Sequence, residues 1–390
     1  MAEKVLEGYR VIEYTQNLSG MHTGLMLAMM GAEVIKVEIP DDPDDLTRRE
    51  APIVNGVSAA FASVNMNKKS VALDFRTPEG AELLKKLLLN ADAFIVTKRM
   101  KDMKSLGFDY ETVHKLNPKL VYGSVTCFGQ TGSLSGLKGG DLIAQAAASN
   151  MDITGHPDGE PTKAGYPVSE MHAGINLCTG ILGSWYKIRK GGEGQLVDVS
   201  MVDTTIAEMR INTGMYVYNG LLPKRGGQTV GSGKGLPATY PSCRATFKTA
   251  DGNIVYSANS PKLFACALKA MNMEDLLERP EFIADREAMG LHPAINKWVQ
   301  EWCKDHGTLE IFVAVSEAGA PAAPILTYKG MLAEENFRPE NRNMFLKVDH
   351  PVLGEMTVTN LPVKWSRCQP TVETAAPLFG QNTEEVLNNL

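Results

Sequence analysis

The first third of the chain alternates short runs of consecutive apolar residues with longer segments whose apolar positions recur at helical spacing. The short runs are typical of strands buried on both faces, and they lie at residues 10–14, 33–37, 70–74, 93–96 and 120–125. Between the first two runs, residues 21–30 predict a buried helix that ends at Gly31. The segment Thr77-Pro78-Glu79 predicts the start of another helix, with an N-cap and a first-position proline. This alternation predicts a parallel sheet with helical crossovers.

The pattern changes in the middle of the chain. Residues 221–239 contain five closely spaced glycines, and residues 247–255 are typical of a hairpin that turns at Asp251-Gly252. Short strands return from about residue 345. We therefore predict an α/β protein with a large domain built on a Rossmann-like open parallel sheet and a smaller α+β second domain. The predicted ranges are 1–205 for the large domain, 206–240 for a glycine-rich linker, 241–325 for the small domain and 326–390 for a return segment that completes the large domain.

Composition and charge exclude several classes of protein. The chain has 390 residues, of which 44% are hydrophobic and 22% charged, as in folded multidomain proteins. The net charge of -6 argues against broad binding to nucleic acids or anionic membranes. No apolar run reaches the ~18 residues of a membrane span, and the first residues lack the apolar core of a signal peptide. The six cysteines form no Cys-x-x-Cys pair. We therefore expect a cytoplasmic protein with reduced thiols.

Common cofactor motifs are missing from the sequence. Residues 19–24 follow the first strand but do not match the G-x-G-x-x-G pattern of dinucleotide-binding folds. The glycine-rich segment contains Gly233-Lys234, but Gln228 replaces the first glycine of a P-loop and Gly235 replaces its serine or threonine. The seven histidines show no metal-binding spacing. We expect neither a nucleotide cofactor nor a metal.

Five short segments occur in an order and spacing that is specific when they are taken together. They are residues 31–38, 65–70, 128–132, 194–200 and 376–380. Together they resemble the class III CoA-transferases, the family of formyl-CoA, carnitine and bile-acid CoA-transferases, whose fold is shared by the 2-methylacyl-CoA racemases. The motif around the family's catalytic carboxylate is Pro, two residues, Asp, three residues, Gly. Residues 167–174 match it, with Glu170 in place of the aspartate.

The residues around Glu170 suit a carboxylate nucleophile. Ser169 predicts the N-cap of an apolar helix, which places Glu170 in the first turn. The positive end of the helix dipole favours an ionised carboxylate there, and a carboxylate nucleophile must be ionised. Helix capping alone is the competing interpretation, because acidic residues are common in first turns. His172 lies two residues further on, so we expect it on another face of the helix.

The resemblance implies ping-pong transfer of coenzyme A, which acts as a substrate, through an acyl-glutamyl anhydride and a glutamyl-CoA thioester on Glu170. Lys98 and Arg99 follow a strand, where open parallel sheets bind ligands. Arg99 and Lys138 match basic positions of the family's CoA site, and Lys68 and Lys69 are weaker candidates. Gln16 and Asn17 end the first strand, where we expect contacts to the acyl group. The resemblance also implies that the glycine-rich segment 226–235 lies over the site, although an interdomain linker is an equal alternative.

Two other functions remain open from the sequence. A 2-methylacyl-CoA racemase carries a histidine before the aspartate that matches Asp141, but this chain has Gly140 there. Family members usually place a bulky side chain at this position, so we expect Gly140 to leave room for the longer Glu170 or for a larger acyl group. The competing interpretation is that Gly140 is a turn residue with no link to Glu170. The second alternative is a catalytically silent acyl-CoA-binding homologue, since Glu170 departs from the family's aspartate. The resemblance also implies an interlocked homodimer.

Overall fold

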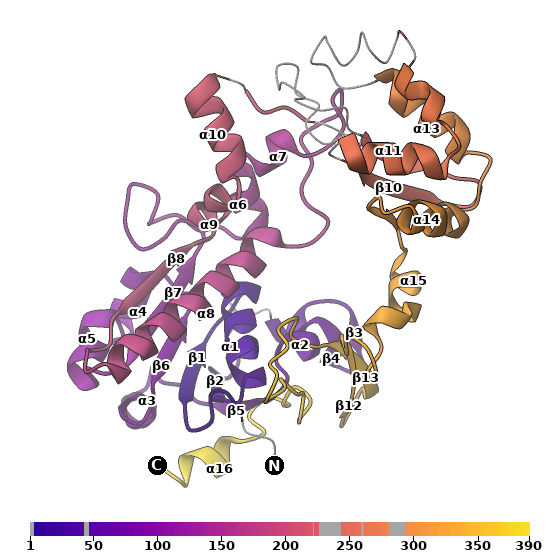
Figure 1. The fold of residues 1–390 in the computed structure, drawn as a ribbon. Helices are drawn as coiled ribbons and strands as arrows, with labels where there is room; N and C mark the ends of the chain where they lie inside the picture. The colour runs from indigo at the N-terminus through magenta and orange to yellow at the C-terminus, as the bar shows by residue number, and fades with distance from the viewer. Residues whose placement is uncertain are drawn as a thin grey trace. The chain divides into compact units, whose positions relative to one another are not determined.

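The computed structural model describes residues 4–42, 47–220, 222–225, 243–258, 261–278, 280 and 293–390. The chain divides into two compact units. The first comprises residues 1–148, 165–208 and 334–390, and the second comprises residues 149–164 and 209–333. The predicted ranges placed residues 149–164 in the large domain, whereas they group with the second unit. The C-terminal segment returns to the first unit (Figure 1).

The first unit is built on a six-stranded sheet in which every neighbouring pair is parallel. The order is β5-β2-β1-β6-β7-β8. The bounds are β1 (Arg10–Tyr14), β2 (Glu33–Glu38), β5 (Lys68–Ala72), β6 (Ala93–Val96), β7 (Val121–Thr126) and β8 (Leu196–Ser200). The predicted parallel α/β architecture is confirmed, because apolar runs such as residues 93–96 are fully buried between two helical layers.

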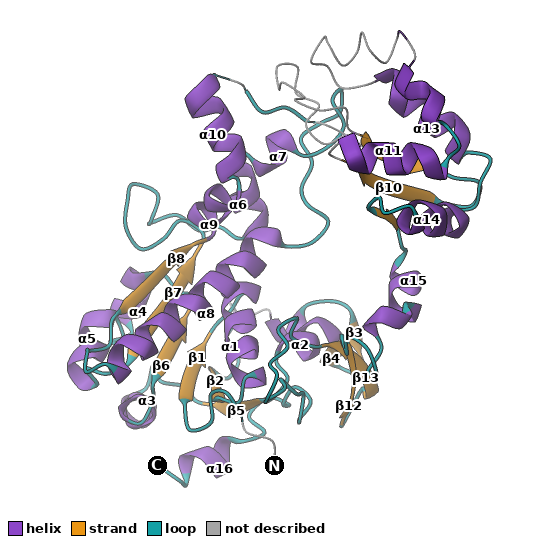
Figure 2. Cartoon of the chain, in the orientation of Figure 1, coloured by secondary structure: helices purple, strands orange, loops and turns teal. Residues whose placement is uncertain are grey.

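Helices cover both faces of this sheet (Figure 2). On one face, α1 (Leu18–Met29) and α8 (Val168–Arg189) pack over the side chains of Val11 and Val34. On the other, α3 (Pro78–Leu89), α4 (Met100–Ser105) and α5 (Tyr110–Leu116) pack over Ile12 and Ile35. The predicted start of α3 is confirmed, since Thr77 accepts a hydrogen bond from the Gly80 N–H. The other elements of this unit are η1 (Thr47–Arg49), β3 (Ile53–Val54), β4 (Val57–Ser58), α2 (Ala59–Val64), α6 (Asp141–Ala147), α9 (Met201–Glu208), η3 (Glu335–Phe337), β12 (Phe345–His350), β13 (Gly354–Thr359) and α16 (Thr383–Leu387).

The strand order reverses between β1 and β6. From β1 the chain moves outward to β2 and β5, and from β6 it moves the opposite way to β7 and β8. The turns that follow β1 and β6 therefore diverge at the carboxyl edge of the sheet, where open α/β sheets bind their ligands. The two turns are joined by a hydrogen bond of 2.9 Å from the Gln16 N–H to the Thr97 hydroxyl.

The outer edge of β5 is covered by residues far away in the sequence. The Ser70 N–H donates to the Asn382 side chain at 3.1 Å, and the Ala72 N–H donates to the Thr383 hydroxyl at 2.9 Å. The Gly380 N–H donates to the Ser70 hydroxyl at 2.9 Å. Side chains just before and within α16 thus take the place of a further strand.

The second unit contains an antiparallel sheet in the order β11-β10-β9. Its strands are β9 (Cys243–Lys248), β10 (Asn253–Ala258) and β11 (Ala322–Pro324). The predicted hairpin is confirmed, with Phe247 opposite Ile254. The unit's helices are α7 (Asn150–Ile153), α10 (Arg210–Asn219), α11 (Pro261–Ala270), η2 (Glu274–Glu278), α13 (Pro293–Cys303), α14 (Thr308–Glu317) and α15 (Tyr328–Ala333).

Candidate active site

Glu170 lies in the first turn of α8, and the carboxylate of Asp141 fixes that turn. The Asp141 Oδ1 atom accepts the N–H groups of Ser169 at 2.8 Å and Glu170 at 3.2 Å. The prediction that Ser169 is the N-cap is wrong, because α8 begins at Val168 and the Ser169 hydroxyl bonds to Thr205 at 2.7 Å. The cap comes from a residue 28 positions earlier in the sequence. Asp141 thus performs the capping that the sequence assigned to a local side chain.

The backbone N–H groups of Leu18 and Asp141 face the carboxylate of Glu170 and lower its pKa. Leu18 is the first residue of α1, and Asp141 is the first residue of α6. The N-terminal ends of two helices, α1 and α6, therefore face the Glu170 side chain. Such ends carry free N–H groups and partial positive charge, which stabilise an anion.

The surroundings of Glu170 also oppose its ionisation. Burial, and after it the charge of the neighbouring Asp141 carboxylate, raise the pKa of Glu170 to about 7 against the lowering effect of the two N–H groups. The Asp141 carboxylate accepts the Glu170 N–H, which holds the two residues close together. A carboxyl group with a pKa near 7 is about half ionised at neutral pH, and its ionised form is more nucleophilic than an ordinary glutamate.

Close packing of α1 against α8 brings Leu18 to Glu170. A Cβ atom on Gly174 would lie 2.6 Å from the Ser19 carbonyl oxygen, so only glycine allows this approach. The Thr23 hydroxyl lies 3.0 Å from both the Ser19 and the Gly174 carbonyl oxygens. The crossing lies one helical turn beyond Glu170 and one residue beyond Leu18. The glycine at the end of the motif in residues 167–174 thus sets the distance between the two helices.

A cavity of about 630 Å³ opens at the switch point of the sheet. It is lined by the ends of β1, β6 and β7 and by the loop before α6, including Gln16, Asn17, Asp42, Arg76, Thr97, Lys98, Arg99, Asp102, Cys127, Lys138 and Gly139. Several of these residues lie next to residues that face Glu170, since Asn17 precedes Leu18 and Gly139 precedes Gly140. Burial, together with the charge of Glu170, raises the pKa of the Cys127 thiol to about 11. The cavity therefore reaches the neighbourhood of Glu170.

The three predicted CoA-binding residues, Lys98, Arg99 and Lys138, line this cavity together. The Arg99 guanidinium is engaged by Asp102 at 2.7 Å and by the Gly136 carbonyl at 2.8 Å, so it also holds the loop that carries Lys138. A fourth basic side chain, Arg76, was missed by the sequence reasoning. Arg76 is paired with Asp74 at 2.8 Å. The sequence feature that could have identified Arg76 as a candidate for ligand binding is its position in the turn after a strand.

The residues predicted to contact the acyl group lie around the same cavity. The Gln16 amide donates to Asp42 at 2.9 Å. Asn17 is the N-cap of α1, because its Oδ1 atom accepts from the Gly20 N–H at 3.3 Å. A Cβ atom on Gly140 would lie 3.5 Å from the Glu170 Oε1 atom. Gly140 therefore faces the Glu170 carboxylate, and a side chain there would point directly at it.

Comparison with known proteins settles the family. CoA-transferase family III matches the chain over residues 6–383. The chain belongs to CoA-transferase family III. A succinyl-CoA–D-citramalate CoA-transferase of Chloroflexus aurantiacus is 31% identical over 387 residues, which cover 99% of this chain and 94% of that protein. A succinyl-CoA:glutarate CoA-transferase of Mus musculus is 28% identical over 387 residues, covering 99% and 86%.

Other relatives extend the comparison. A formyl-CoA:oxalate CoA-transferase of Streptomyces coelicolor is 28% identical over 403 residues, covering 99% of this chain and 95% of that protein. The crystal structure of a CAIB/BAIF family protein from Brucella suis has a TM-score of 0.85 and 27% identity, covering 99% of both chains. This family III CoA-transferase is therefore an acyl-CoA:carboxylate CoA-transferase with the fold of its family.

Two lysines of this CoA-transferase that were predicted as weaker candidates for CoA binding, Lys68 and Lys69, do not line the switch-point cavity. The Lys68 side chain has no exposed surface and pairs with Glu13 at 2.8 Å. Lys69 pairs with Glu33 and Glu385, each at 2.8 Å, and does not line the cavity. His172, which was expected on another face of the helix than Glu170, lies 3.9 Å from Glu208. The glycine-rich segment 226–235 lies outside the described residues.

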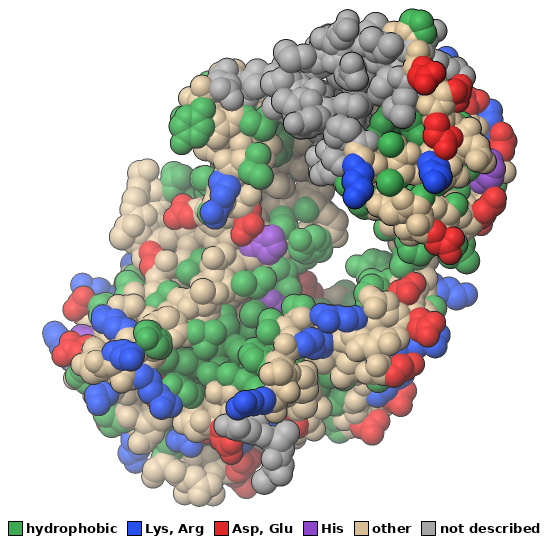
Figure 3. Space-filling view, in the orientation of Figure 1, with side chains coloured by type: hydrophobic (Ala, Val, Ile, Leu, Met, Phe, Trp, Pro, Cys, Tyr) green, Lys and Arg blue, Asp and Glu red, His purple; other side chains and the backbone are tan. Residues whose placement is uncertain are grey.

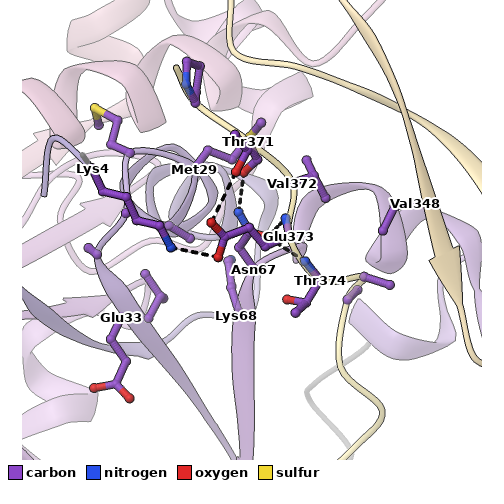
Figure 4. Close-up of a pocket in the computed structure, with 18 of the residues that line it drawn as sticks. Lys4, Met29, Glu33, Asn67, Lys68, Val348, Thr371, Val372, Glu373 and Thr374 are labelled. Carbon is purple, nitrogen blue, oxygen red and sulfur yellow. Dashed lines mark hydrogen bonds and ion pairs between the residues drawn. The ribbon is translucent and has the colours of Figure 1, made fainter. Parts of the chain in front are cut away.

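A second cavity in the CoA-transferase, of about 900 Å³, lies between the end of α1, β5 and the C-terminal segment (Figure 4). Asn67 fastens that segment, because its side chain donates to the Thr371 carbonyl at 2.6 Å and accepts from the Glu373 N–H at 2.7 Å. Lys4 pairs with Glu373 at 2.7 Å. This cavity shares no lining residue with the one at the switch point, as far as the described residues show.

The described part of the CoA-transferase contains no cluster of three or more histidine, cysteine, aspartate or glutamate side chains placed to bind a metal ion. None of its described helices has the length and apolarity that crossing a membrane requires.

Proposed function

We propose that this enzyme transfers CoA from an acyl-CoA thioester to an acceptor carboxylic acid through covalent intermediates on Glu170. The observation that carries the proposal is the Glu170 carboxylate, held by the N–H groups of Leu18 and Asp141 beside a basic cavity. This arrangement gives a carboxyl group that ionises near neutral pH, is fixed in orientation and lies adjacent to space for a ligand.

The proposed reaction exchanges one activated carboxyl group for another at each step. Glu170 attacks the thioester carbon, forming an acyl-glutamyl anhydride and releasing CoA thiolate. The thiolate then attacks the glutamyl carbonyl, which releases the donor acid and leaves a glutamyl-CoA thioester. The acceptor carboxylate attacks that thioester, giving a second anhydride, and the returning thiolate attacks the acceptor's carbonyl. The new acyl-CoA leaves and Glu170 is regenerated, so no metal or nucleotide is consumed.

The N–H groups of Leu18 and Asp141 have a role in each step that proceeds at the glutamyl carbonyl. Attack there converts a carboxyl oxygen of Glu170 into an oxyanion, and donors already aimed at that oxygen stabilise it without reorganisation. Loss of a comparable donor costs about 100- to 1000-fold in rate. The two N–H groups thus support both the ionised nucleophile and the tetrahedral intermediates that form on it.

We assign the switch-point cavity to CoA. Its basic side chains supply the local positive charge that an acidic protein needs to bind phosphates. Among the described residues, the ammonium groups of Lys98 and Lys138 have no ion-pair partner, so both are available to a ligand. The carboxyl edge of the sheet would then direct the thiol end of CoA toward Glu170.

The relatives indicate which substrates to test first. Their names specify succinyl-CoA with glutarate or D-citramalate, and formyl-CoA with oxalate. We propose succinyl-CoA as the first donor and short dicarboxylic acids as the first acceptors. Because the assignment comes from relatives near 30% identity, a panel of acyl-CoA donors and acids should be screened by product mass.

Trapping the intermediate tests the mechanism. The purified enzyme is incubated with acyl-CoA and then with hydroxylamine or borohydride, and the labelled peptide is mapped by mass spectrometry. We expect the label on Glu170 and no transfer by Glu170→Ala. A label on another residue, or full activity of Glu170→Ala, would overturn the assignment. Exchange of the α-hydrogen without a new thioester would instead identify a racemase, and CoA binding without either reaction would identify a silent homologue.

We also propose that the enzyme is a homodimer. Its helix α10 exposes four large apolar side chains, Ile211 at 76%, Tyr216 at 55%, Val217 at 66% and Tyr218 at 84%. Figure 3 shows hydrophobic side chains over α10 and also over α8. Apolar surface of this kind favours contact with another protein surface, here a second copy of the chain. Sedimentation velocity at micromolar concentration should give the mass of two chains, and a monomer would contradict the proposal.

A further inference from the structure

Three charged side chains lie beneath α1 in an otherwise apolar core. Glu13 in β1, Lys36 in β2 and Lys68 in β5 all have side chains with no exposed surface. Glu13 is directly opposite Lys36 in the strand register. The Glu13 carboxylate lies 3.5 Å from the Lys36 ammonium and 2.8 Å from that of Lys68. Buried charges of this kind seldom stabilise a fold relative to apolar side chains, so a local purpose is the hypothesis to test.

Both lysines donate to backbone oxygens around the start of α1. The Lys36 ammonium donates to the Thr15 carbonyl at 2.8 Å and to the Thr15 hydroxyl at 3.2 Å. The Lys68 ammonium donates to the Met21 carbonyl at 2.8 Å. Thr15 precedes Leu18 by three residues, and Met21 follows it by three. The two contacts therefore fix the backbone on either side of the N–H group that faces the Glu170 carboxylate.

Helix α1 lies in close contact with these buried charged side chains. A Cβ atom on Gly24 would lie 1.8 Å from the Glu13 Oε2 atom, so α1 rests directly on the carboxylate. The Lys68 ammonium also bonds to the Asn65 side chain at 2.8 Å, and the Thr15 hydroxyl donates to Glu13 at 2.7 Å. Each charged group is thus engaged by an opposite charge or by a polar group that belongs to this cluster. Directed hydrogen bonds hold a helix at one position and rotation, which apolar contacts alone do less strictly.

We propose that Glu13, Lys36 and Lys68 are positioning residues for the transfer reaction, holding the β1–α1 turn so that the Leu18 N–H meets the Glu170 carboxylate. They act through the backbone and touch neither CoA nor the acyl group. This inference rests on the proposed role of Glu170 and assigns a function to buried charges that the reaction itself does not use.

The test uses Lys36→Met and Lys68→Met, each of which leaves Glu13 with one lysine partner and therefore no uncompensated charge. Arg10→Met is the control, because Arg10 pairs with Glu33 at 2.6 Å across the same two strands but at their amino ends. Folded sites are counted by the stoichiometry of CoA binding, and kcat is expressed per site. Hydrogen exchange of the Leu18 amide is measured in the same proteins.

We expect kcat per site to fall at least about 10-fold in either lysine variant, because a displacement near 1 Å costs about 100-fold. The KM for acyl-CoA should change less than about 3-fold, and the Leu18 amide should exchange faster than in the wild type. Arg10→Met should match the wild type in both measurements. A variant that binds CoA fully, with wild-type kcat per site and unchanged exchange at Leu18, overturns the inference. If the wild type itself transfers no CoA, the proposed function fails, while the exchange of the Leu18 amide still decides whether the lysines position the turn.

Discussion

Replacing Gly174 by alanine should separate α1 from α8 at the point where they cross beside the nucleophile. The new Cβ atom would lie 2.6 Å from the Ser19 carbonyl oxygen and 3.2 Å from the His22 ring. Restoring an ordinary contact near 3.4 Å requires a displacement of roughly 0.8 Å, since backbone oxygens cannot rotate away as side chains do. Glu170 lies one turn away, so much of this displacement would reach the contact between its carboxylate and the Leu18 N–H.

The expected result is a loss of activity larger than the loss of stability. A misplacement near 1 Å costs about 100-fold in rate, so kcat/KM should fall by about 10- to 100-fold. Overpacking costs about 1–3 kcal/mol, but alanine is favoured over glycine within a helix by about 1 kcal/mol. The free energy of unfolding should therefore fall by no more than about 2 kcal/mol.

The assay is steady-state transfer from succinyl-CoA, or from the donor found by screening, together with denaturant unfolding. Gly183→Ala is the matched control, because Gly183 lies in the same helix and a Cβ atom there would meet nothing within 4 Å. It should leave kcat/KM unchanged and stabilise the protein slightly. Wild-type kcat/KM in folded Gly174→Ala would refute the view that this crossing sets the geometry of Glu170.

Four further predictions concern Glu170 and the switch-point cavity. Because the pKa of Glu170 is raised to about 7, kcat/KM should rise with pH through a midpoint near 7, and a midpoint near 4.5 would contradict the buried carboxylate. The same shift destabilises the ionised form, so wild type should lose stability relative to Glu170→Gln between pH 4.5 and 8, by at most about 3 kcal/mol in denaturant unfolding. Gly140→Tyr and Glu170→Asp should be coupled by more than about 0.5 kcal/mol in a double-mutant cycle of kcat/KM, whereas additivity would show that the two departures are independent. Lys138→Ala and Arg99→Ala should each weaken CoA binding by about 1.5–3 kcal/mol by calorimetry, while Lys101→Ala, outside the cavity, should not.

The sheet was predictable because short runs of apolar residues alternate with segments whose apolar positions recur at helical spacing. The helix start at α3 was predictable because its cap is local, with Thr77 bonding three residues ahead. The start of α8 was not, since its capping carboxylate, Asp141, comes from a different helix. A sequence reading can identify capping side chains only where the chain keeps them adjacent.

In the candidate site, too, local sequence patterns predicted some residues, whereas other pairings arise only from the folded structure. Glu170 was found through its motif, and Lys98 with Arg99 through their place after a strand. Lys68 was predicted as a weaker candidate for CoA binding, since lysines are seldom buried without a partner. Its partner, Glu13, lies 55 residues earlier, and only the pairing of β1, β2 and β5 brings the two charges together.

The cover over β5 has a consequence for how the chain is made. An unpaired edge strand offers its N–H and C=O groups to any other extended chain. The residues that protect β5 are synthesised more than 300 positions after it, because Asn382 is 312 residues from Ser70. During synthesis the nascent sheet therefore carries an open edge until almost the entire chain has emerged from the ribosome. Shortening the chain before Gly380 would make that exposure permanent, and the product should self-associate through β5 even though every residue of the catalytic site is present.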